Sequence, residues 1–459
     1  MSDRAGFLSS LIAPLRGRRE FRLMWAGQTL SVLGSQLTML ALPLVVLRAT
    51  GSATAAGLAL TVRLLAATAA RLPAGVSADR SDRRRLMMTA DASRAAAVLG
   101  VAVAVLCHHT WLPVILAAVV VDGVATAYFG PAQSAAVRHL VADDDLASVM
   151  GLNQARAQSI SVIGPPLGGL LFAVAPWLPF VIDVATYTVS LACLAAIRTP
   201  LGGRRTEADG AGEDGSGEDG SGESIMQGAL AGLRFVGRQR FLTWLLAWAA
   251  LTNFATAGVV FGLLLVVGPS HASAIGTAYA LVACGGIAGA MVAPRLVRVR
   301  PVAVVLGASI VTAGMGLAIA VSPTPATAIA AIAGICAVGP LIAVPLETRV
   351  YSVVPDEWMG RVQSSLFLVG GSIYPLGGLV MGALAQHTSV RWAYAAFAVV
   401  LAVVLVLTAT PTFRRQIAAF GAATGSTSDS TSASTSDSVT AIRSEETREP
   451  QPAGAASAH

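Results

Sequence analysis

The chain has 459 residues, of which 54% are hydrophobic and 12% are charged, and this charged share is about half that of an ordinary soluble domain. Apolar runs of about 20 residues, the length that a helix needs to cross a bilayer, recur along the whole sequence, so the composition excludes a large soluble protein. The formal net charge is +6, and every basic residue other than histidine is arginine; without lysine the chain can have neither a Walker-type ATPase site nor Schiff-base chemistry.

Twelve apolar runs follow one another between charged or Pro/Gly breaks. Only helices satisfy the backbone of runs this long inside lipid. We therefore predict an all-α membrane protein with twelve transmembrane helices. In chain order the predicted spans are 23–47, 52–78, 87–107, 111–135, 150–174, 178–197, 240–267, 273–296, 302–321, 325–350, 361–386 and 391–411.

Arginine is concentrated in alternate connections between these spans. The connections after spans 2, 6 and 8 are rich in arginine, and Arg414 and Arg415 follow span 12, whereas spans 1 and 11 are followed by Arg48 and Arg391 alone. Because arginine-rich connections stay on the cytoplasmic side, this alternation predicts a multi-pass protein of the inner (cytoplasmic) membrane with both termini in the cytoplasm.

One polar segment divides the spans into six and six. It contains the tandem repeat GEDGSGEDGS, whose composition is that of a flexible linker. The predicted organisation is a cytoplasmic N-terminal segment (1–22), a first six-helix bundle (23–198), a cytoplasmic linker (199–239, with 199–224 disordered), a second six-helix bundle (240–415) and a disordered cytoplasmic tail (416–459).

The two halves also resemble each other in sequence. MGLNQARAQSISVIGPPLGGLL from Met150 and MGRVQSSLFLVGGSIYPLGGLV from Met359 align without a gap, and both join equivalent spans of their halves. The repeats are therefore parallel, which predicts two pseudo-symmetric bundles related by an axis along the membrane normal.

Two short motifs carry a resemblance to a known family. GVSADRSDRRR, between spans 2 and 3, resembles the loop motif of the major facilitator superfamily (MFS) of secondary transporters, and GPPLGG in span 5 resembles that superfamily's antiporter motif. The segments FRLMWAGQTLSVLGSQLTMLALPLVVLRATGSA and PFVIDVATYTVSLACL are similar to its drug and siderophore exporters. The matching positions are Gly75, Asp79, Arg80, Arg83 and Arg84 in the loop, and Gly164, Pro165, Gly168 and Gly169 in span 5.

This resemblance implies the MFS fold and export by alternating access. It implies a monomeric antiporter driven by the proton gradient, with no cofactor, whose partners are a small amphipathic drug or natural product and the lipid bilayer. Asp79 is expected to act as a conformational latch that meets the start of span 11 near Gly360 when the cytoplasmic side closes. The arginine-rich loop is too short to bind nucleic acid.

Asp122 lies in the middle of span 4 and is our candidate for proton coupling. A carboxylate in hydrocarbon is costly, and a desolvated carboxyl group takes up a proton more readily than one in water. The alternative is a structural pair with a neighbouring helix, for which Arg156 of span 5 is one partner. For Asp183 in span 6 we favour a structural role.

Polar side chains on spans 1 and 7 are candidates for the substrate cavity. On span 1 they recur at spacings that place them on one helical face, and such a face avoids lipid. In the resembling family, spans 1, 4, 7 and 10 line the central cavity. The candidates are Gln28, Ser31 and Ser35 (with Thr38 on the same face) on span 1, and Thr252, Asn253 and Thr256 on span 7.

Two other functions stay open at this point. The first is an MFS importer or symporter of a small metabolite. The second is a membrane-embedded enzyme, which is disfavoured because the loops lack a catalytic His/Asp/Cys constellation; for the same reason no metal site is expected. We therefore predict a transporter.

Overall fold

The computed structural model describes residues 19–141, 146–199, 234–299, 301–411 and 413–415. The predicted disordered tail (416–459), nearly all of the predicted linker and most of the N-terminal segment lie outside the described residues. The side chains of Asp79 and Arg80 and the surroundings of Gly360 also fall outside them, although all three residues belong to helices.

Within the described part, the chain folds into twelve helices of 19 residues or more. The first bundle contains α2 (Arg19–Thr50), α3 (Ala53–Arg80), α4 (Arg83–Leu106), α5 (Leu112–Leu140), α6 (Leu146–Val174) and α7 (Leu178–Ala196). The second contains α9 (Arg240–Val267), α10 (Ala272–Val299), α11 (Pro301–Val321), α12 (Pro325–Val353), α13 (Asp356–His387) and α14 (Val390–Ala409), with the short 3-10 helix η3 (Pro269–His271) between α9 and α10.

These helices confirm the twelve predicted spans. Eleven of them are long and apolar enough to cross a membrane by length and composition, and the twelfth, α13, packs against α9 and α3. Several helices extend past the apolar run that predicts them; α13, for example, begins five residues before the predicted 361. Hydropathy marks the part of a helix that suits lipid, whereas backbone hydrogen bonding continues to the next cap.

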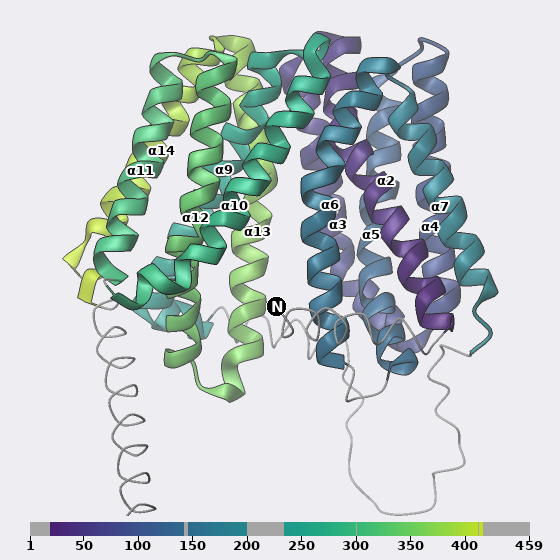
Figure 1. Ribbon diagram of the computed structural model, residues 1–459, viewed down its shortest axis with the longest axis horizontal. Coiled ribbons are helices and arrows are strands. Elements are labelled where there is room, and N and C mark those ends of the chain that lie inside the picture. Colours follow the sequence, from purple (N-terminus) through teal and green to yellow (C-terminus); the bar gives the residue numbers. More distant parts are fainter. Residues whose placement is uncertain (1–18, 142–145, 200–233, 300, 412, 416–459) are drawn as a thin grey trace, which may run out of the picture.

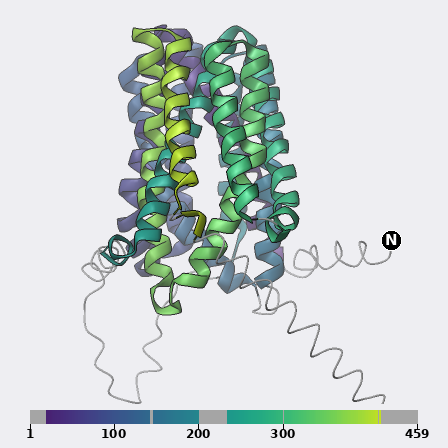
Figure 2. The same cartoon turned by 90° about the vertical axis from the view of Figure 1, so that its left-hand side faces the viewer.

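The two bundles stand side by side, and all the long helices run along roughly one direction (Figures 1 and 2). The bundles lie close together at the top of Figure 1 and separate toward the bottom, between α6 and α13. We call the top the closed end, where α2 turns into α3 and α6 into α7. The other end, where α2 begins and α14 ends, is the terminal end.

Backbone contacts hold the bundles together near the closed end. A Cβ atom on Gly169 of α6 would overlap the carbonyl oxygen of Ala272 at the start of α10, and one on Gly57 of α3 would lie 2.6 Å from the carbonyl oxygen of Gly378 of α13. Ser52 donates from Oγ to Gln386 Oε1 at 2.7 Å across the same boundary. Small residues let membrane helices approach this closely, so glycine is required at these crossings.

Replacing Gly169 by alanine should weaken this closed-end contact. The added methyl group overlaps a backbone oxygen that cannot move alone, and overpacking of this kind costs about 1–3 kcal/mol. We expect Gly169→Ala to lower the thermal unfolding midpoint of the purified protein by several degrees and to reduce transport. The control is Gly151→Ala on the same helix, where a Cβ atom has no neighbour within 4 Å; equal midpoints for the two variants would contradict the contact.

Candidate functional site

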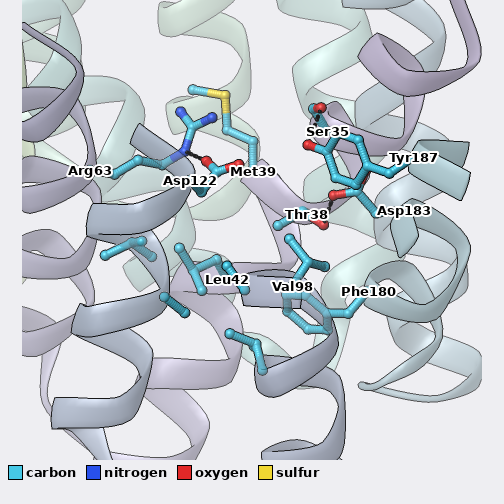
Figure 3. A pocket seen from close by; sticks show the side chains of 14 residues that line it. Ser35, Thr38, Met39, Leu42, Arg63, Val98, Asp122, Phe180, Asp183 and Tyr187 are labelled. Atoms are coloured by element: carbon cyan, nitrogen blue, oxygen red, sulfur yellow. Dashed lines mark hydrogen bonds and ion pairs between the residues drawn. The ribbon is translucent and has the colours of Figure 1, made fainter. Parts of the chain in front are cut away.

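Asp122 of α5 lies between two arginines from neighbouring helices. Arg63 of α3 donates from Nε to Asp122 Oδ2 at 2.5 Å, and Arg94 of α4 donates from Nε to Asp122 Oδ1 at 3.2 Å. The side chains are 10%, 17% and 9% exposed for Asp122, Arg63 and Arg94. This buried triad ties α3, α4 and α5 together inside the first bundle (Figure 3 shows the Arg63 pair).

Arg94 extends the triad to a second carboxylate and to α2 and α7. Its Nη1 lies 3.7 Å from Asp91 Oδ1, its Nη2 donates to Ser35 Oγ at 3.0 Å, and its guanidinium carbon lies 4.6 Å from the centre of the Tyr187 ring. Asp91 is fully buried and also accepts a hydrogen bond from Ser190 Oγ at 2.6 Å. Arg94 therefore connects its own helix α4 to α2, α5 and α7.

Asp183 of α7 is a third buried carboxylate and has different partners. It is 0% exposed. Its Oδ2 accepts a hydrogen bond from Thr38 Oγ1 at 2.6 Å, and Thr186 Oγ1 approaches Oδ1 at 3.4 Å. No arginine among the described residues lies within the 4.0 Å ion-pair distance of it. We call Arg63, Asp91, Arg94, Asp122 and Asp183 the buried charge network; fully ionised, it carries three negative charges and two positive charges.

A small cavity of about 20 Å³ lies between Asp122 and Asp183. A cavity needs roughly 10–15 Å³ of such volume to hold one water molecule, so this one has room for a single water beside both carboxylates. Figure 3 shows the polar side chains along one side of it and Leu42, Val98 and Phe180 along another. Leu42 and Phe180 each lie about one turn nearer the closed end than Thr38 and Asp183, so the cavity is apolar toward that end.

The polar face predicted on span 1 contacts its own bundle. Ser35 bonds to Tyr187 Oη at 2.9 Å and donates to the Ser31 carbonyl at 2.8 Å. Gln28 accepts a hydrogen bond from Gln133 of α5. The face thus packs on α4, α5 and α7, and Ser35 belongs to the surroundings of the buried charge network.

The span 7 candidates lie in α9 and have separate surroundings. Asn253 donates from Nδ2 to the Gly370 carbonyl of α13 at 3.0 Å. Thr256 lines a small apolar void against α12, and Thr252 Oγ1 is buried with no hydrogen-bond partner among the described residues. The three side chains have different partners, and their role in a substrate cavity stays a prediction.

The loop motif between α3 and α4 has local structural roles. Asp82 caps α4 by accepting from Arg84 N at 2.9 Å, and Arg84 caps the end of α7 by donating to the carbonyls of Leu194 and Ala195 at 2.9 and 2.5 Å. Gly75, Asp79 and Arg80 form the end of α3, and Arg83 begins α4 half-buried. The latch contact of Asp79 is therefore outside what the structure describes.

The antiporter motif of α6 contacts α2 of its own bundle and α10 of the other bundle. A Cβ atom on Gly164 would lie 2.8 Å from Gln36 Cβ of α2, and one on Gly168 would lie 3.3 Å from Leu37 Cα, whereas Gly169 meets α10 of the other bundle. The Pro165 carbonyl leaves no room for a Cβ atom on Gly276 of α10. The motif therefore joins α2 to the closed-end contact through one helix.

Sequence reasoning missed Asp91 and Arg94. They stand three residues apart within span 3, where any ionisable residue is costly, and that spacing was the available signal. Arg156, which we considered as a partner of Asp122, instead lies 5.9 Å from the Trp25 ring centre. Within the described ranges, no three His, Cys, Asp or Glu side chains come together as a metal site.

Known proteins resemble the chain in sequence. A family model described as the Major Facilitator Superfamily matches residues 24–375. The chain is 30% identical to macrolide efflux protein A of Streptococcus pyogenes over 193 residues, 41% of this chain and 47% of that protein, so the match spans about half of that relative. It is 25% identical to the multidrug efflux pump Tap of Mycobacterium tuberculosis over 383 residues, 80% of this chain and 87% of the pump.

Solved structures resemble the chain in fold. A bacterial homologue of the iron transporter ferroportin in its inward-facing state has a TM-score of 0.62 at 16% identity, covering 85% of this chain and 97% of that one. A bacterial homologue of the lysosomal transporter Spinster, inward-facing and unoccupied, has a TM-score of 0.61 at 14% identity, covering 87% and 97%. Nucleoside transporter NupG has a TM-score of 0.61 at 13% identity, covering 84% and 98%. The family match over most of the sequence, together with this shared fold, shows that the chain belongs to the major facilitator superfamily and is a membrane transporter rather than an enzyme.

Proposed function

We propose that this transporter is a proton-coupled antiporter that exports a small amphipathic drug or natural product by alternating access. It works as a monomer in the inner membrane, with both termini in the cytoplasm, and uses the proton gradient without a cofactor. The observation that carries the proposal is the buried charge network, in which three carboxylates face two arginines inside one bundle. One bound proton balances that charge, and its release restores the imbalance.

Two observations support export as the direction of transport: the similarity to efflux proteins and the distribution of arginine. The efflux proteins named above are similar in sequence, and export of drug-like compounds by this chain would give antibiotic resistance. The arginine-rich connections assign the terminal end to the cytoplasm. The structure, closed at the opposite end (Figure 1), then corresponds to an inward-facing state that takes substrate from the cytoplasm.

The loop motif supplies the latch in this proposal. Asp79 stands in the last turn of α3 at the terminal end, and the N-terminus of α13 offers the partial positive charge that favours an anion. Meeting of these two groups stabilises the outward-facing state, while Asp82 and Arg84 fix the surrounding helix ends.

The proposal is tested in inside-out vesicles from cells that express the chain. We expect ethidium or a macrolide to accumulate when the vesicle lumen is acidified, and the ionophore nigericin, which collapses the pH difference, to abolish accumulation. Added substrate should also raise the lumenal pH. Accumulation that survives nigericin would contradict proton coupling, and loss of preloaded metabolite with protons would support the importer instead.

Replacing Asp122 by asparagine should abolish transport. The change leaves two buried guanidinium groups without their shared counter-ion, and breaking a buried pair costs about 3–5 kcal/mol. We expect vesicle accumulation to fall to the level of membranes without the protein. Glu347→Gln, which neutralises an exposed carboxylate on α12, should keep near wild-type transport at equal protein amount; transport by Asp122→Asn at that level would rule out a requirement for the ion pairs.

Replacing Asp79 by asparagine should slow transport and leave membrane insertion intact. The latch acts on the balance between the two states, so the expected loss is several-fold in rate at an unchanged protein amount. Rate and membrane content are measured in the same vesicles, and an unchanged rate would contradict the latch.

A further inference from the structure

We infer that Asp183, and not Asp122, is the group that binds and releases the transported proton, while Asp122 stays a fixed counter-ion of Arg63 and Arg94. This inference rests on the proposed function, because it names the proton site of that antiporter. Proton binding transfers a proton from a hydronium ion to one Asp183 carboxylate oxygen, which forms an O–H bond and leaves water; release transfers that proton back to water and re-forms hydronium.

The partners of the carboxylates separate their roles. Both oxygens of Asp122 are engaged by arginine nitrogens, at 2.5 and 3.2 Å. Asp91 lies 3.7 Å from the guanidinium of Arg94. Among the described residues, the side-chain partners of Asp183 are the hydroxyl groups of Thr38 and Thr186. A hydroxyl donor serves the ionised and the protonated carboxyl group alike, so a proton can come and go at Asp183 without breaking an ion pair.

The charge around Asp183 makes one proton sufficient. The charged groups around Asp183 are Arg94 of α4, Asp122 of α5 and Arg63 of α3, and Arg94 is itself paired with Asp91, while α2 contributes hydroxyl groups and α7 contributes Tyr187. Without Asp183, these groups carry two charges of each sign. An ionised Asp183 is then an excess charge in a low-dielectric interior, whereas a protonated Asp183 leaves the site neutral.

The small cavity provides a place for the exchanging water. It touches Asp183, Thr38, Asp122 and Arg63 and has room for one water. Leu42 and Phe180 border it toward the closed end (Figure 3), so protons from that side meet an apolar barrier in this state. The barrier keeps the proton site separate from the closed side until the helices move.

The location of the carboxylates in the chain supports the same assignment. The second bundle, residues 240–415, contains only Glu347, Asp356 and Glu357 as acidic residues, and all three stand near the terminal end. Mid-membrane proton binding must therefore use the first bundle, where Asp183 is the carboxylate outside the ion pairs.

Infrared difference spectroscopy of the purified full-length protein in nanodiscs tests the inference directly. Between mildly acidic and mildly alkaline pH, the wild type should show the C=O stretching band of one buried protonated carboxyl group. Asp183→Asn should lose this band, and it is expected to fold because asparagine matches the neutral form and still accepts from Thr38. Asp122→Asn combined with Arg63→Gln removes one charge of each sign and so keeps the charge balance around Asp183; in matched samples that retain the folded circular dichroism spectrum, this double variant should keep the band. Thr38→Val should shift the frequency of the band, because that hydroxyl group bonds the carboxyl oxygen directly.

The outcomes separate this inference from the proposed function. Absence of the band in the wild type, or its survival in Asp183→Asn, overturns the proton site whatever the transport assay shows. A band that only Asp183→Asn removes, in a protein whose transport ignores the pH gradient, supports the site and contradicts the antiporter. In proteoliposomes Asp183→Asn should retain substrate exchange but lose substrate-induced proton release, and normal proton release would overturn the inference.

Discussion

The ion pairs of Asp122 with Arg63 and Arg94 are the constraint around which the first bundle is arranged. Two guanidinium groups and a carboxylate inside a membrane are costly unless each finds its partner, so α3, α4 and α5 must keep the rotation that brings them together. Arg94 also contacts α2 through Ser35 and α7 through Tyr187.

The two halves share their helical arrangement but differ in their buried charged residues. Glycines serve the same purpose in both, since a Cβ atom on Gly169 of α6 would overlap the Ala272 carbonyl of α10, and one on Gly382 of α13 would overlap the Ala53 carbonyl of α3, at the closed end. The buried charge network belongs to the first half. A symmetric pair of bundles can rock about a shared boundary, and in the proposed antiporter the proton site lies on one side of that boundary.

Sequence alone predicted the elements well and the contacts poorly. Span number and order follow from apolar run length, because lipid permits few alternatives to a helix. Asp122 also stood out, since a carboxylate in the middle of a membrane span is costly unless it is paired or has a function. Its partners did not stand out, because pairing depends on helix rotation: the sequence suggested Arg156, which the structure places beside Trp25, and did not point to Arg63 or Arg94. The face of Ser35 and Thr38 was identified, but whether it turned to its own bundle or to the boundary depended on that same rotation.

Asp183 also stands where helix packing is tightest. A Cβ atom on Gly34 of α2 would lie 2.5 Å from Asp183 Oδ1 and 3.0 Å from its Cα. One turn on, α2 meets α6 at Gly168, and the next residue of α6 meets α10 across the closed-end boundary. Contacts therefore run without a gap from the carboxylate to the contact between the bundles. A carboxyl group that changes charge at the tightly packed crossing of α2 and α7 changes the free energy of that crossing. The helix that must adjust is α2, which also packs on α6 next to the closed-end contact.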